Sequence, residues 1–82
     1  MDLCLRYREV ILGIEIKVWR PGAQDPLQEG LSQLDAYLAG LDQNTGWLVI
    51  FDRRPDLAPL AERLSQSDAL SPDGRMVRVV RV

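Results

Sequence analysis

Histidine is absent from this chain of 82 residues, and cysteine occurs once, as Cys4. Without histidine, the chain lacks the commonest general base and the commonest zinc ligand. A metal site would have to use carboxylate and carbonyl oxygens, which suit magnesium, manganese or calcium. A lone thiol forms no internal disulfide and fits a reducing compartment, so we expect a cytoplasmic location.

Long apolar runs and a basic excess are also missing. No run approaches the roughly 18 residues of a transmembrane helix, and the first residues do not have the pattern of a secretion signal, so we expect no membrane contact. Ten basic and twelve acidic residues leave a net charge of −2. Any nucleic-acid binding would therefore depend on a local site. An apolar fraction of 46% favours a globular chain, and the length predicts one small domain.

Hydrophobic periodicity predicts two strands, over residues 2–7 and 10–19, with a two-residue turn between them. A helix is expected next, with Asp25 as its N-cap and Pro26 at its first helical position, and it should end near residue 41.

Two more strands follow, over residues 47–51 and 76–82, with a short helix near residues 57–64 left open. A strand–helix–strand connection implies a parallel pair beside the hairpin. The fold class is therefore α/β, or α+β, with a mixed sheet.

Glu15 and Lys17 carry the first chemical signal. A period of two places both side chains on one strand face, and Ile16 on the other. A hairpin with an even turn pairs Asp2 with Glu15, with their Cβ atoms roughly 4.5–5.5 Å apart. Two carboxylates at that spacing repel unless a cation lies between them. A slip of one residue would turn Asp2 to the other face, and Glu-x-Lys alone also occurs on ordinary solvated strands.

Phosphodiester hydrolysis uses these groups. Carboxylates hold a divalent ion that polarises the phosphate and acidifies water. A lysine ammonium orients the water or stabilises the charge that develops on the phosphate oxygens.

Gln33 and Tyr37 carry the second signal. They are four residues apart, so they lie on one face of the expected helix. Beside them runs a stripe of leucines at helical spacing, formed by Leu27, Leu31, Leu34, Leu38 and Leu41. Gly30 lies between them and that stripe, and would let the helix approach the sheet closely. Both side chains would then reach the strand face that bears Glu15 and Lys17. The alternative is a boundary glutamine and a half-buried tyrosine of purely structural importance.

The remaining basic and aromatic residues have plainer interpretations. Arg53 and Arg54 follow a strand end and either contact a phosphate backbone or lie solvated in a loop. Trp19 and Trp47 are expected to be packing residues.

Asp, then Glu-x-Lys on a strand, then Gln-x-x-x-Tyr on the next helix, is similar to the order found in the exonuclease-like branch of the PD-(D/E)XK nuclease superfamily. The stretches 14–22, 25–38 and 46–54 resemble nuclease-like domains at the C-terminal end of bacterial proteins, some of them ATPases. The resemblance covers roughly residues 2–54.

The resemblance implies a restriction-endonuclease-like mixed sheet with a β-hairpin, one main helix and a following parallel strand. It implies Asp2 and Glu15 as metal ligands with the Ile16 carbonyl, Lys17 as the catalytic cation, and Gln33 and Tyr37 as supporting groups. Mg2+ or Mn2+ would be the cofactor and DNA the partner. Residues 1–82 would form one nuclease-like domain, with a core over 2–54 and a C-terminal extension over 55–82.

The family's domain begins with a helix before the aspartate, and this sequence starts one residue before Asp2, so we expect either a fragment or a shortened domain without that helix. An apolar hairpin face would then be uncovered, so we expect self-association, or cover from an upstream segment or a partner chain. Three functions remain open: a metal-dependent nuclease-like domain that hydrolyses DNA, a catalytically inactive nuclease-fold module with a regulatory or protein-interaction role in a larger, possibly ATPase-linked protein, and a small domain whose acidic cluster is incidental.

Overall fold

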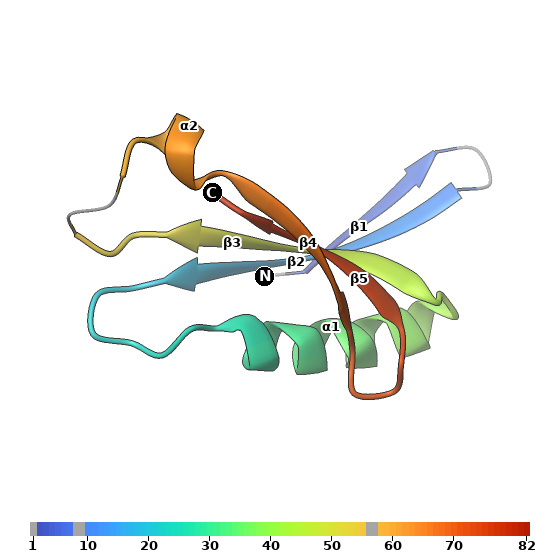
Figure 1. Cartoon of the computed structure of the whole chain (residues 1–82). Coiled ribbons are helices and arrows are strands. Elements are labelled where there is room, and N and C mark those ends of the chain that lie inside the picture. Colours follow the sequence, from blue (N-terminus) through green and yellow to red (C-terminus); the bar gives the residue numbers. More distant parts are fainter. Residues whose placement is uncertain (1, 8–9, 56–57) are drawn as a thin grey trace.

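The computed structural model describes residues 2–7, 10–55 and 58–82, and within these it leaves out the side chains of Asp2, Tyr7 and Leu60. In the part described, one five-stranded mixed sheet carries a long helix along one face (Figure 1). The strands are β1 (Asp2–Tyr7), β2 (Val10–Trp19), β3 (Thr45–Asp52), β4 (Ser65–Leu70) and β5 (Met76–Arg81), and the helices are α1 (Leu27–Leu41) and α2 (Leu60–Arg63).

The sheet has the order β1-β2-β3-β5-β4. The outer pairs β1–β2 and β4–β5 are antiparallel, whereas β2, β3 and β5 run parallel to one another. The expected mixed sheet, with a parallel pair beside the hairpin, is confirmed. So is the expected register, because Asp2 pairs with Glu15 and Tyr7 with Val10. The turn at residues 8–9 lies outside the described residues.

The start of α1 differs from the expectation by one residue. Pro26 is the N-cap, with φ −77° and ψ 12°, and the helix proper begins at Leu27. Asp25 lies one position outside and accepts a hydrogen bond from the Leu27 backbone N–H at 3.1 Å. Its short carboxylate therefore still satisfies a donor of the first turn, although it is not the N-cap itself.

Strand β4 was not expected from the sequence. Its residues, Ser-Gln-Ser-Asp-Ala-Leu, include no β-branched or aromatic side chain, and all except Ala69 are exposed. The strand forms because it pairs with β5 through a turn in which Gly74 has φ +83°. Pairing at a sheet edge thus outweighs weak intrinsic β-propensity.

The hydrophobic core lies between α1 and the middle of the sheet. The leucine stripe of the helix packs there, and β5 adds side chains from the chain's last third. The fully or almost fully buried apolar residues are Leu31, Leu34, Leu38, Leu48, Ile50, Val77 and Val79. Leu38 rests on two glycines, since a Cβ on Gly13 or Gly46 would come within 2.6 or 2.8 Å of its methyl groups. Small residues on β2 and β3 therefore set how closely the helix approaches.

The opposite face of the sheet is apolar and much of it is exposed. By register, seven of the eight large hydrophobic side chains that are exposed in the described residues lie on the strands of this face. They are Leu3, Leu5, Val10, Val18, Phe51, Leu70 and Met76. We call these seven residues the open face. Within the described ranges, no helix is both long and apolar enough to cross a bilayer.

Candidate functional site

Strand β2 presents Glu15 and Lys17 to the layer occupied by α1. Two observations show that these alternate residues face the helix: Gly13 lies against Leu38, and Glu15 is only 1% exposed. The antiparallel register puts Asp2 directly opposite Glu15 on the neighbouring strand, so the two residues share this face. The predicted side-by-side placement of the two acidic residues therefore holds for the backbone, while the Asp2 side chain lies outside the description.

Lys17 joins the strand motif to the helix motif. Its Nζ donates a hydrogen bond to Gln33 Oε1 at 3.2 Å, across sixteen positions of sequence. Nζ also lies 3.1 Å from Glu29 Oε1, to which Gln33 Nε2 donates a further bond at 3.1 Å. The lysine, the glutamine and the glutamate therefore form a closed triangle of hydrogen bonds over the face that carries Glu15.

Gly30 makes this contact possible. A Cβ at that position would lie 2.7 Å from Leu48 Cδ1 and 3.2 Å from Lys17 Cγ, both closer than ordinary contact. The absence of a side chain lets the first turn of α1 lie directly on β2 and β3. The expected close approach of helix and sheet at this glycine is confirmed.

The other two predicted residues frame the site. Tyr37 lies one helical turn after Gln33 and packs, half-buried, against the hydrophobic core. Ile16 turns to the opposite face of the sheet, as expected, while its backbone stays in β2 between Glu15 and Lys17. The structure thus places all six candidate residues on β1, β2 and α1.

The donor set fits a hard divalent cation in chemical type. Glu15 is a carboxylate held out of water between helix and sheet, and buried charges in proteins are paired or bound to metals. Oxygen ligands of this kind suit Mg2+ or Mn2+. Among the side chains that the structure describes, no three acidic, histidine or cysteine groups converge as metal ligands. A cation would therefore have to be held by Glu15 together with Asp2 and the backbone.

Glu29 is a site residue that the sequence did not single out. It is 63% exposed, yet it accepts hydrogen bonds from both Lys17 and Gln33. The available signal was its position four residues before Gln33, which places both side chains on one face of α1. Glu29 fixes the lysine ammonium and the glutamine amide in one orientation.

A buried polar cluster is centred on Asp35, in the middle of α1. Asp35 accepts a hydrogen bond from the Ser71 hydroxyl and forms a 2.9 Å ion pair with Arg75. The Ser71 and Arg75 contacts hold the pKa of the Asp35 carboxyl below its usual value. Arg75 also donates to the Gln43 carbonyl at 3.1 Å. This cluster ties the helix to the β4–β5 hairpin and lies away from Lys17.

Comparisons of this chain with protein-family models, with curated proteins and with solved structures gave no match. The site is therefore characterised by its own geometry. A buried carboxylate, an ammonium group and an amide converge on one sheet face, beside a second acidic residue in register.

Proposed function

We propose that this chain is a metal-dependent nuclease-like domain that hydrolyses DNA phosphodiester bonds. The observation that supports this most is the hydrogen bond from Lys17 on β2 to Gln33 on α1. It brings a Glu-x-Lys strand and a Gln-x-x-x-Tyr helix, distant in sequence, onto one surface. Those are the groups by which the sequence resembles the PD-(D/E)XK superfamily, and we propose a restriction-endonuclease-like fold on the same grounds.

The proposed roles follow from chemistry and position. Glu15 and Asp2, with the Ile16 carbonyl, would hold Mg2+ or Mn2+. When bound, such an ion supplies positive charge that polarises a phosphate and makes nearby water more acidic. Lys17 orients the attacking water or stabilises negative charge on the phosphate oxygens. Gln33 positions the lysine, and Glu29 holds both in place.

The open face supports a second candidate function. Monomeric proteins rarely expose contiguous apolar patches larger than a few hundred Å2, and larger patches mark interaction surfaces. Leu5, Val10 and Leu70 are each more than half exposed, and all lie on the side of the sheet away from α1. A catalytically inactive nuclease-fold module, bound through this face to the rest of a larger protein, would have this surface.

Cleavage of DNA distinguishes the two candidates. Wild-type protein should cut single- or double-stranded DNA when Mg2+ or Mn2+ is added, and should stop when the ion is chelated. Lys17→Ala should lower the rate at least about 100-fold, since it removes a charge that acts on the reacting phosphate. Arg78→Ala, which removes a cation on the opposite face, should cleave like wild type. Equal rates for wild type and Lys17→Ala would reject the catalytic proposal and favour the interaction module.

A further inference from the structure

A second polar site lies where the three parallel strands end. Trp19, Asp52 and Arg81 are the last residues of β2, β3 and β5, and the strand ends lie together at one edge of the sheet. A cavity of about 280 Å3 occupies this position, and it is lined by Trp19, Asp52, Arg54, Ala58, Arg63, Arg81 and Val82.

Arg54 lies at the wall of the cavity, where an ion pair and a ring contact hold its guanidinium group. Its Nε and Nη2 donate to the Asp52 carboxylate at 3.0 and 2.7 Å, and its guanidinium plane lies 3.5 Å from the centre of the Trp19 ring. The Arg54 hydrogen bond lowers the pKa of Asp52 to about 2, so the pair stays charged at neutral pH. A guanidinium fixed in this way loses little conformational entropy when a ligand binds.

The other two arginines are also anchored, and both keep unused donors. Arg81 pairs with Asp25 through both terminal nitrogens, at 3.3 and 2.9 Å. Arg63 donates from Nη1 to the backbone oxygens of Asp52 and Val82, and its buried Nε has no hydrogen-bond partner in the part of the chain described. A guanidinium carries five N–H donors, so all three retain N–H groups for a further acceptor.

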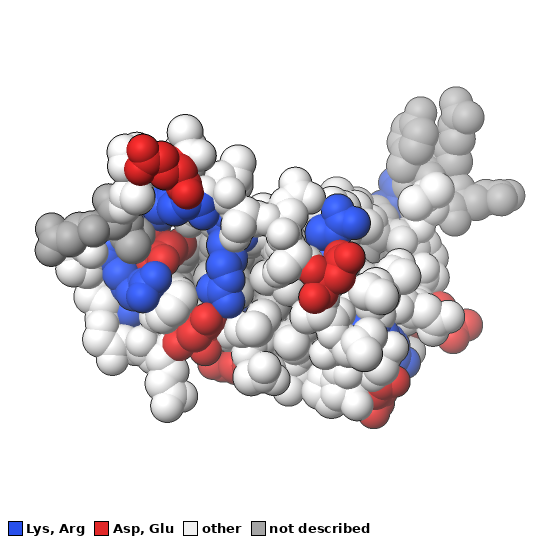
Figure 2. All heavy atoms as spheres, in the orientation of Figure 1, with Lys and Arg blue, Asp and Glu red and all other residues white. Residues whose placement is uncertain are grey.

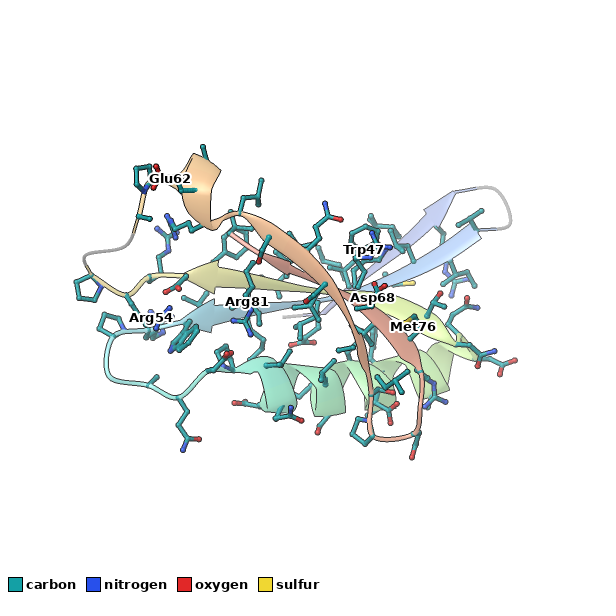
Figure 3. All side chains as sticks on the ribbon, viewed as in Figure 1. Trp47, Arg54, Glu62, Asp68, Met76 and Arg81 are labelled. Carbon is teal, nitrogen blue, oxygen red and sulfur yellow. The ribbon has the colours of Figure 1, made fainter. Side chains whose placement is uncertain are left out.

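The charge around the cavity is positive although the whole chain is negative. Arg20 and Arg53, both exposed, adjoin the lining residues Trp19 and Arg54 in sequence. Half of the ten basic residues of the chain therefore belong to this end of the sheet, against Asp25, Asp52 and Glu62, which adjoins Arg63 in α2. Figure 2 shows blue side chains gathered where β3 ends and α2 lies, with acidic groups among them. Arg54 and Arg81 both occupy this end of the sheet (Figure 3).

We propose that this cavity binds a phosphate group, either of a small phosphorylated molecule or of a nucleic-acid backbone. Planar guanidinium groups match phosphate oxygens in geometry and charge, and several fixed arginines around one space suit a tetrahedral dianion or a diester. The volume of about 280 Å3 lies at the lower end of the roughly 300–1,000 Å3 typical of small-molecule sites, which suits a phosphate with a small attached group. This inference does not depend on hydrolysis at Lys17.

The two tryptophans supply an internal control for the test. Trp19 lines the arginine cavity, whereas Trp47 lines a shallow pocket on the open face beside Asp68, Met76 and Arg78 (Figure 3). When inorganic phosphate is titrated into the 82-residue chain, the indole N–H signal of Trp19 should shift in a nuclear magnetic resonance spectrum and that of Trp47 should not. Shifts of both signals, or of neither, would overturn the proposal.

Variants and a second ligand complete the test. Arg63→Gln and Arg81→Gln should each weaken phosphate binding at least tenfold, whereas Arg78→Gln, with the same loss of charge, should stay within about twofold. A short single-stranded DNA that shifts Trp19 and displaces phosphate identifies a nucleic-acid backbone as the source. DNA that leaves bound phosphate in place identifies a small phosphorylated ligand. An equal loss of affinity in all three variants would mean diffuse charge attraction and would contradict a built site.

Discussion

The Nζ atom of Lys17 on β2 lies 3.2 Å from the amide oxygen of Gln33 on α1. This contact joins the two short motifs that carry the chemical argument, and it exists because Gly30 lets the helix lie close to the sheet. It also gives the two residues unequal roles. The lysine is the charged group, while the glutamine orients it from the helix.

Substitutions on the helix should therefore affect catalysis less than loss of the lysine. We expect Gln33→Ala to lower the rate of DNA cleavage roughly tenfold and Tyr37→Phe to lower it less, against at least about 100-fold for Lys17→Ala. Single-turnover cleavage rates with saturating Mn2+ measure the order. A Gln33→Ala effect as large as that of Lys17→Ala would show that the glutamine acts directly on the substrate.

Replacement of a glycine of α1 by alanine should raise the stability of the protein at one position and lower it at another. Gly40→Ala should stabilise the protein by roughly 0.5–1 kcal/mol, because a Cβ there meets nothing within 4 Å and alanine favours the helix. Gly30→Ala should destabilise it by about 1 kcal/mol or more, since the methyl group would displace Leu48 and Lys17. Urea unfolding of both variants gives the two values. Stabilisation by Gly30→Ala would disprove the close approach at the site.

Acid should remove stability that Asp52 contributes. Arg54 lowers the pKa of Asp52 in the folded chain from 3.8 to about 2. Because the folded pKa is the lower one, this contribution is present above about pH 4 and is lost as the pH falls toward 2. Between pH 4 and pH 2, the melting temperature of the wild type should fall further than that of Asp52→Asn, in which the side chain no longer titrates. Parallel thermal melts compare them, and identical losses would show that the pair does not stabilise the fold.

The open face should make the chain self-associate. We expect light scattering to give a mass that rises with protein concentration, since burial of these apolar side chains favours a second copy when nothing else covers them. Leu70→Lys should shift the equilibrium toward monomer, because Leu70 is 62% exposed on that face. Ala39→Lys, on the exposed side of α1, is the control. A monomer whose melting temperature does not change with concentration would contradict this prediction.

The sequence was most informative where its patterns are local and strong. Residues 10–19 are rich in β-branched side chains, and the structure has a strand with those bounds. The spacing of the two strands predicted a hairpin with an even number of turn residues. That prediction correctly paired Asp2 with Glu15. The leucine stripe and Gly30 predicted which face of α1 meets the sheet.

Features that arise from tertiary pairing could not be predicted in this way. Strand β4 has a polar sequence and forms only against β5, so local propensity gave no signal. Glu29 reaches Lys17 only after α1 has docked on the sheet. Arg54, Arg63 and Arg81 come from a loop, from α2 and from the end of β5, and the fold brings them to one cavity. Each of these depends on how the elements pack against one another, which periodicity does not determine.

Binding of Mn2+ tests the central proposal most directly, because it does not require the right DNA substrate to be known. Calorimetric titration should show Mn2+ binding to wild type and to Lys17→Ala, and no measurable binding to Glu15→Gln, which keeps the size of the buried side chain but removes its charge. Circular dichroism should show all three proteins folded. Equal Mn2+ affinity for wild type and folded Glu15→Gln would contradict the proposed metal site, and with it the proposed mechanism of phosphodiester hydrolysis.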